Sequence, residues 1–139
     1  MSLLDYYDED TFTLTLPPDF NKELFNIPFD TQKIIFKEEK YPIVSQFNQS
    51  VDNLRNSITH LTFGYKFNQS VDNLPNSITH LTFGTKFNRL VDHLPNSIKH
   101  LAFGYKFDLP VDNLPNSITH LIFGVKFNQP LDNLPNTIK

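Results

Sequence analysis

The apolar residues of this chain recur with a period of twenty residues, and their spacing changes within each period. In the unit that begins at Phe67, the residues Phe67, Val71 and Leu74 are spaced like one face of a helix. Further along, Leu81 and Phe83 alternate with polar residues, as the inward-facing residues of a β-strand do. The pattern predicts one short strand per unit, with a short helical, 3₁₀ or irregular segment before it.

A unit of this length cannot bury its own apolar face, so the units must stack. Stacking places equivalent residues in columns about 4.8 Å apart, the spacing of a parallel sheet. We therefore predict a leucine-rich-repeat-like repeat solenoid with one parallel β-sheet, and a three-sided parallel β-helix is the alternative. Asn68 is placed to cap the short helical turn, and Gly84 frees the backbone to leave the strand. Strands are expected at residues 12–16, 32–36, 59–63, 79–83, 99–103 and 119–123.

The repeat register organises residues 1–139 as a single solenoid domain. Residues 1–19 are expected to form an N-terminal cap strand region, residues 20–46 a degenerate repeat, and residues 47–139 the tandem repeats, of which the last is incomplete. The segment 37–46 is longer than its counterparts and should project from the stack as an insertion loop. The chain ends where another strand is due, and an uncovered sheet edge can pair with a further strand. This motivates a homodimer through the C-terminal edge.

Phenylalanine is the unusual component, with 14 residues in the chain, and cysteine is absent. The missing cysteines exclude disulfides, thiolate zinc sites and a cysteine nucleophile, so stability must come from packing. We expect stacked units to join their phenylalanines into one apolar spine. Its members are Phe63, Phe67, Phe83, Phe87, Phe103, Phe107, Phe123 and Phe127.

The net charge of −3 gives no electrostatic reason to expect nucleic acid or an anionic membrane as a partner. Residues 1–10 are acidic and lack the basic start and apolar run of a secretory signal, and no later window resembles a membrane span. The expected location is intracellular and cytoplasmic.

Four histidines recur at the strand position that should point away from the core: His60, His80, His100 and His120. The neighbouring outward positions hold Thr62, Thr82, Ala102 and Ile122. These neighbours offer no carboxylate to orient an imidazole, so catalysis is not expected. A column of equivalent imidazoles also lacks the convergent arrangement of a zinc site, so a metal-binding histidine ladder is a minor alternative and no cofactor is expected.

The simplest interpretation is a stacked, hydrogen-bonded histidine ladder on the exposed sheet face, shared with Tyr65 and Tyr105. Charging adjacent imidazoles is unfavourable, so we predict neutral histidines at pH 7 and a weaker stack below about pH 6. Partner contacts are expected where the units differ, and the outward strand position reads Thr, Thr, Ala, Ile from unit to unit. An exposed isoleucine at Ile122 suits a protein partner better than a small polar ligand.

Lysine and aspartate form two further columns, and either is able to bind an oppositely charged partner. Solubility and local hydrogen bonding are the simpler explanation for both. The columns contain Lys66, Lys86, Lys106 and Lys126, and Asp52, Asp72, Asp92, Asp112 and Asp132.

Two motifs, Phe-Gly-x-x-Phe-Asn at residues 83–88 and Leu-Pro-x-Ser-Ile-x-x-Leu-x-Phe at residues 74–83, resemble those of the FNIP repeat family. This family is a leucine-rich-repeat relative found in amoebae and large DNA viruses. The resemblance is strong over residues 47–139 and weak over residues 12–36. It implies a protein-interaction scaffold without catalytic activity. Some members carry an N-terminal F-box, for which the residues before the first repeat are too few.

The resemblance also implies that the Asn of each Phe-Asn pair bonds backbone groups of adjacent coils. On that basis a structural ladder is assigned to Asn48, Asn68, Asn88 and Asn128, with Asp108 as a conservative break. Its role would be to satisfy polar groups between coils, since unpaired buried groups are costly.

The leading functional hypothesis is a non-enzymatic protein–protein interaction module that uses the exposed sheet face. The alternative is a structural or self-assembling unit that dimerises through the C-terminal edge, and the metal-binding ladder is third.

Overall fold

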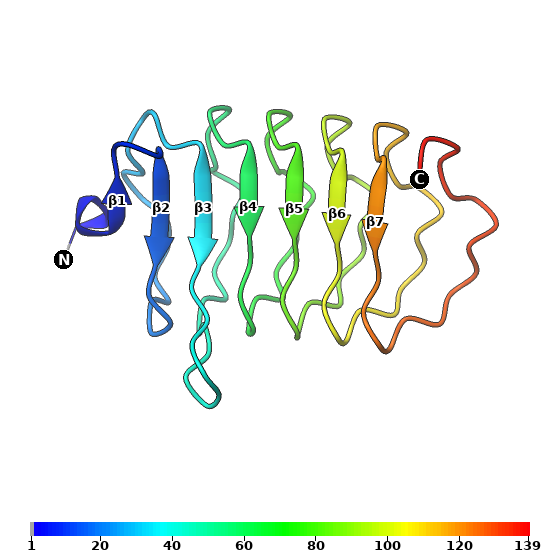
Figure 1. Ribbon diagram of the computed structural model, residues 1–139, viewed down its shortest axis with the longest axis horizontal. Coiled ribbons are helices and arrows are strands. Elements are labelled where there is room, and N and C mark those ends of the chain that lie inside the picture. The colour runs from blue at the N-terminus through cyan, green and yellow to red at the C-terminus, as the bar shows by residue number, and fades with distance from the viewer. Residues whose placement is uncertain (1) are drawn as a thin grey trace.

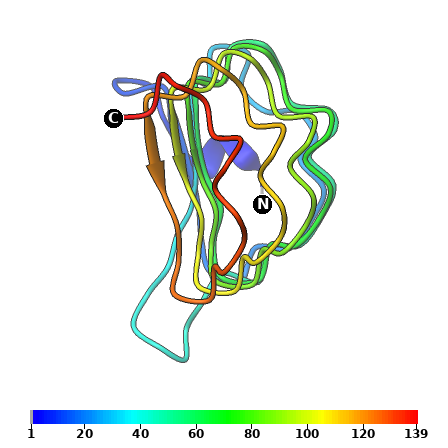
Figure 2. The same ribbon diagram turned by 90° about the vertical axis from the view of Figure 1, so that its right-hand side faces the viewer.

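The computed structural model describes residues 2–139, which form a solenoid with one seven-stranded sheet in the order β1 to β7. Each coil contributes one strand, and the rest of the coil returns through irregular backbone on the other side (Figure 1, Figure 2). The strands are β1 (Tyr7–Asp8), β2 (Thr13–Leu16), β3 (Lys33–Phe36), β4 (His60–Thr62), β5 (His80–Thr82), β6 (His100–Ala102) and β7 (His120–Ile122).

Strands β2 to β7 are parallel, and the register places each residue beside its equivalent in the next coil. His60 pairs with His80, and Leu81 pairs with Leu101. The predicted solenoid with one parallel sheet is therefore confirmed, with strands slightly shorter than expected at their ends. The described residues contain no second sheet, so the three-sided β-helix does not apply.

The helical spacing of Phe67, Val71 and Leu74 does not produce a helix or a 3₁₀ turn. Residues 67–74 are irregular, and Asn68 caps no helix. All three apolar side chains are nevertheless buried, because each lies at an inward-facing point of the coil. Within residues 2–139 the one 3₁₀ helix is η1 (Leu3–Tyr6).

The core contains two interleaved columns of phenylalanine rings, which confirms the predicted spine. The rings of Phe63 and Phe67 have centroids 3.6 Å apart within one coil, and those of Phe63 and Phe83 are 5.7 Å apart between coils. Phe36 and Phe47 continue the stack toward the N-terminus at 4.0 Å. Because each ring touches both its own coil and the next, the interior is one continuous apolar cluster.

Glycine recurs after each of the last four strands, and after the last three of them the coils touch backbone to backbone. A Cβ atom at Gly84 would lie 2.0 Å from the carbonyl oxygen of Gly64, and one at Gly104 would lie 2.1 Å from that of Gly84. No glycine has a positive φ angle. The expected conformational reason for Gly84 is therefore wrong, and close backbone approach is the actual one.

The N-terminal cap is more elaborate than the expected single strand. The short strand β1 pairs antiparallel with β2, and η1 precedes it. The hydroxyl of Tyr7 donates to the carboxylate of Asp30 at 2.6 Å, which joins this cap to the first turn of the solenoid.

The insertion loop, residues 37–46, projects beyond the carboxyl end of β3, as expected from its length (Figure 1, Figure 2). Its anchor is Glu38, whose carboxylate accepts hydrogen bonds from the backbone N–H groups of Ser45 and Tyr65. The loop therefore lies against the exit of β4 and does not fold over the N-terminal cap.

Candidate functional site

The four strand histidines form a stack of rings on the outer face of the sheet. Successive ring centroids are 4.2, 4.2 and 4.4 Å apart, and the rings are within 11° of parallel. The parallel register produces this stack directly, because it pairs each histidine with the next. The side chains are thereby held in one conformation although the face is accessible to solvent.

A threonine before the histidine fixes the protonation of three of these rings. The hydroxyl of Thr79 lies 2.8 Å from Nδ1 of His80 and 3.2 Å from the carbonyl oxygen of Thr59. A carbonyl oxygen only accepts, so the hydroxyl donates to the carbonyl and accepts from Nδ1–H. The same arrangement surrounds His60 and His120. This bond directs Nε2 of each ring away from the threonine, whereas Lys99 replaces the threonine before His100.

The stack lowers the pKa of the two histidines nearest its N-terminal end. Burial lowers the pKa of His60 below 6.5, with further contributions from the charges of Lys33 and His100. Burial also lowers the pKa of His80, together with its histidine neighbours and Lys99. These two imidazoles are therefore neutral at pH 7.

The other outward side chains complete a shallow apolar hollow on this face. The hollow measures about 190 Å³ and is lined by His80, Leu81, Thr82, His100, Leu101, Ala102, His120 and Ile122. Thr62 continues the row of outward positions on β4, next to Ile35 on β3. Ile122 is 64% exposed and Ile35 is 37% exposed, so isoleucines stand at both ends of the row.

Tyr65 and Tyr105 do not extend the histidine stack. Each follows the glycine at which the chain turns away from the sheet, so its ring lies on another surface. The ammonium of Lys86 is 5.6 Å from the centre of the Tyr65 ring, and that of Lys126 is 5.8 Å from the centre of the Tyr105 ring. The structure therefore groups the tyrosines with the lysine column.

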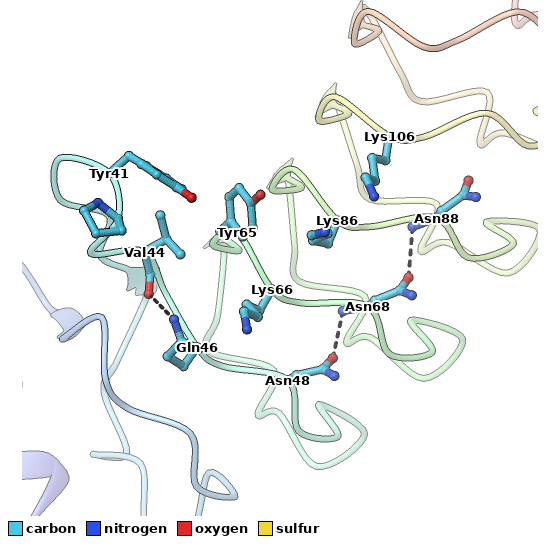
Figure 3. A pocket seen from close by; sticks show the side chains of 11 residues that line it. Tyr41, Val44, Gln46, Asn48, Tyr65, Lys66, Asn68, Lys86, Asn88 and Lys106 are labelled. Atoms are coloured by element: carbon cyan, nitrogen blue, oxygen red, sulfur yellow. Dashed lines mark hydrogen bonds between the residues drawn. The ribbon is translucent and has the colours of Figure 1, made fainter.

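The asparagine residues form a hydrogen-bonded ladder along the solenoid. The backbone N–H of Asn68 donates to Oδ1 of Asn48 at 2.9 Å, and Asn88 bonds to Asn68 at the same distance (Figure 3). Asp108 takes the next position, and the N–H of Asn128 donates to its carboxylate at 2.8 Å. Hydrogen bonds from Gln129 and from the backbone of Asn128 lower the pKa of Asp108.

The aspartate column is occupied by local bonds between coils. Asp52 accepts a hydrogen bond from the side-chain amide of Asn73, and Asp112 accepts one from Asn133. The carboxylate of Asp72 lies 3.4 Å from Nδ1 of His93, which replaces the usual asparagine. These bonds agree with the structural interpretation of the column.

Sequence reasoning missed a groove at the carboxyl ends of the strands. The groove has a volume of about 800 Å³ and lies between the insertion loop and the asparagine ladder (Figure 3). The lysine column was visible in the sequence. That the loop would form a wall beside it depends on the contact between Glu38 and Tyr65, which no periodicity reveals.

Residues 2–139 contain neither a cluster of metal-ligating side chains nor a membrane-spanning helix. Among residues 2–139, no three histidine, cysteine or carboxylate side chains lie close enough together to hold a metal ion. The stacked rings illustrate why, since parallel imidazoles do not direct their lone pairs at one point. None of the helices in this part of the chain has the length and apolar character needed to span a membrane.

A single parallel sheet, stacked coils of one strand each and continuous internal ladders define the molecule as a leucine-rich-repeat-like solenoid protein. The family model described as FNIP Repeat matches residues 47–86, 70–106 and 107–139. The chain belongs to the FNIP repeat family.

One solved structure extends this comparison. CroV588, a giant-virus protein whose crystal structure is reported as a novel circular LRR protein, is 38% identical in sequence and superposes with a TM-score of 0.65. The match covers 92% of this chain and 23% of that chain, so the present chain spans less than a quarter of CroV588. Among curated proteins, none matches this chain significantly.

Proposed function

We propose that this chain is a non-enzymatic interaction module that binds a partner protein on the outer face of β3 to β7. The observation that carries this proposal is the histidine stack, which holds four imidazoles in a fixed row between exposed isoleucines. A repeat scaffold of the FNIP family supports the same conclusion, because a stack of units presents an extended surface.

The physical properties of this face suit a protein partner. The centres of protein interfaces are depleted in charge and enriched in aromatic side chains. Here the imidazole of His80, whose pKa is lowered by burial, lies beside Thr82 and Ala102, so covering it favours the neutral ring and does not require desolvation of a charge. Because the rings are already stacked, little side-chain entropy remains to be lost on binding.

A site-specific photocrosslinker tests the proposed face. We expect p-benzoylphenylalanine in place of Ala102 to capture a discrete partner in a host-cell extract. The same group in place of Asn113, on the opposite side of the coil, should not capture it. The captured protein would then be purified and its Kd for the chain measured.

A matched pair of substitutions distinguishes specific binding at the sheet face from nonspecific binding elsewhere on the surface. Ile122→Asp should weaken the purified complex by about tenfold or more, because it places a charge where an exposed apolar side chain would contact the partner. Val125→Asp introduces the same charge at a residue that is 79% exposed outside the face, and it should leave Kd unchanged. Equal effects of the two variants, or equal crosslinking from positions 102 and 113, would overturn the proposal.

A second candidate function is self-assembly through β7. This strand is the last in the sheet order, and the phenylalanines behind it are less covered than their counterparts. The edge is complementary to one more coil, and CroV588, a longer chain described as a circular LRR protein, is consistent with coils that continue past this point. Light scattering over a wide concentration range tests this candidate, because dimerisation must raise the mass with concentration. A constant monomer mass would exclude it.

A further inference from the structure

The groove at the carboxyl ends of the strands is a second surface, separate from the sheet face. Lys66, Lys86 and Lys106 project into it from three successive coils. Tyr41 and Tyr65 stand on one side, and the asparagine ladder runs along the other (Figure 3). We call this surface the lysine groove; Tyr41, Pro42, Val44, Gln46, Asn48, Tyr65, Lys66, Asn68, Lys86, Asn88 and Lys106 line it.

The lysines of this groove are not neutralised by the protein itself. Across residues 2–139 the ion pairs are Lys37 with Glu39 and His93 with Asp72. The carboxylate nearest the groove along the loop, Glu38, instead accepts backbone N–H groups at the base of the loop. Three ammonium groups therefore lie side by side without a carboxylate partner, which creates a local positive potential on a chain of net charge −3.

The asparagine ladder borders the same groove. Each Oδ1 accepts a backbone N–H from the next coil, so the orientation of the amide is fixed. The asparagine side chains extend away from the lysines (Figure 3), so the ladder holds the three coils in register while the ammonium groups supply the charge of the groove.

We propose that the lysine groove binds an extended acidic peptide segment of a partner protein. Neighbouring coils of a parallel sheet are about 4.8 Å apart, so the three lysines span about 10 Å, the length of three extended residues. Carboxylates of such a segment meet the ammonium groups of the three lysines. Tyr41, which is 79% exposed, offers an aromatic surface to an apolar residue beside the acidic run.

Charge favours a short peptide over a nucleic acid in this groove. The positive potential is local, and the remainder of the molecule is net negative, so a long polyanion would be repelled where it leaves the groove. At the C-terminal end the ladder continues with Asp108, whose lowered pKa keeps it ionised. This carboxylate repels an anionic ligand and limits the groove to the coils of the three lysines.

The direct test uses fluorescein-labelled hexaglutamate as probe, with hexaglutamine as the uncharged control, and measures binding by fluorescence anisotropy at low and physiological salt. We expect the first peptide to bind, more weakly at higher salt, and the second not to bind. The triple variant Lys66→Glu, Lys86→Glu, Lys106→Glu should raise Kd by about tenfold or more, since three attractions become repulsions.

The matched control reverses three lysines elsewhere and so carries the same net charge. Lys22→Glu, Lys99→Glu, Lys139→Glu should keep Kd within about twofold, and circular dichroism verifies that both triple variants fold. Equal weakening by both triple variants, or binding of hexaglutamine, would overturn the proposal. Because the sheet face is unchanged in the groove variant, failure here leaves the proposed function unaffected.

One further variant and one further probe test which kind of ligand the lysine groove binds. Asp108→Asn should extend the ladder of neutral amides and tighten hexaglutamate binding by about twofold or more. No gain would contradict the limit that Asp108 places on the groove. Oligothymidylate of similar charge should bind more weakly than hexaglutamate, and tighter binding would identify the groove as a nucleic-acid site and overturn the peptide proposal.

Discussion

The interior and surface columns of this solenoid arise from the same period but tolerate different degrees of variation. Phe83 and Gly84 recur unchanged as Phe103 and Gly104, whereas the outward residue between the core positions varies from Thr82 to Ala102 and Ile122. In a stack, the neighbour of an interior residue is its own copy, so a change must fit two identical contacts at once. A surface residue also meets its copies in the two adjacent coils, but its outer side faces solvent and leaves room for a change. The comparison separates residues that hold the coils together from residues free to bind something.

The largest effect is expected from Gly104→Ala, which places a methyl group against backbone. The added Cβ would lie 2.1 Å from the carbonyl oxygen of Gly84, and neither backbone can withdraw without opening the sheet. We expect a loss of about 3 kcal/mol or more in the free energy of unfolding, measured by urea denaturation. Thr82→Ala, on the exposed face, should cost less than about 0.5 kcal/mol. If Gly104→Ala lowered the free energy of unfolding as little as Thr82→Ala, interior and surface columns would not differ in their tolerance of substitution.

Phe83→Ala should cost about 3 to 5 kcal/mol, because it removes a ring that contacts neighbours in its own coil and in both adjacent coils. Phe123→Ala is the matched control, since the same ring position is only partly buried behind β7. Its cost should be about half as large. The two variants would be compared by the same denaturation experiment, and equal costs would show that the end coil is as well packed as the middle.

Asn68→Ala tests the asparagine ladder, which joins adjacent coils at partly exposed positions. It removes the Oδ1 acceptor for the N–H of Asn88, at a partly exposed site, and should cost about 1 kcal/mol. Asn68→Asp keeps an acceptor at the same place, as Asp108 does naturally, and should recover most of the loss. Thermal melts of both variants would measure the difference. Failure of the aspartate to restore stability would mean that the ladder depends on more than this acceptor.

The smallest effect concerns the histidine stack and its dependence on pH. The folded pKa values of His60 and His80 lie below 6.5, so the unfolded chain binds protons more readily than the folded one. Stability is therefore complete above about pH 6.5 and decreases as the pH falls toward the folded pKa values. Melting temperatures between pH 8 and pH 5 should show this decrease, and His80→Gln should reduce it. A flat profile in the parent protein would contradict the assigned sign.

Much of the fold follows from the sequence because the period carries it. The strand expected at 79–83 appears as His80–Thr82, and the ring stack from Phe63 to Phe127 follows once equivalent residues align. The spacing of Phe67, Val71 and Leu74 was misleading, since an irregular coil can bury residues three and four apart without forming a helix. Periodicity reports which residues face inward, and it does not determine the backbone between them.

The features that escaped prediction are those formed by unique residues. Strand β1 lies outside the repeat, and its pairing with β2 has no counterpart elsewhere in the stack. The wall of the lysine groove depends on Glu38, which bonds the backbone of Tyr65 at a separation of 27 residues. A contact that occurs once, between a loop and a later coil, does not appear in the repeat pattern of the sequence. The lysines were therefore visible in the sequence, but the groove was not.

The glycine column has a consequence for how this molecule can change in length. Because each coil rests directly on the main chain of the one before it, a whole coil can be duplicated or deleted without disturbing the contacts of the others. One duplication would add a strand, a histidine, a lysine and an asparagine together. A change in the number of coils would thus extend the sheet face and the lysine groove together. A longer stack would bind a long ligand more tightly because it offers more copies of the same contact.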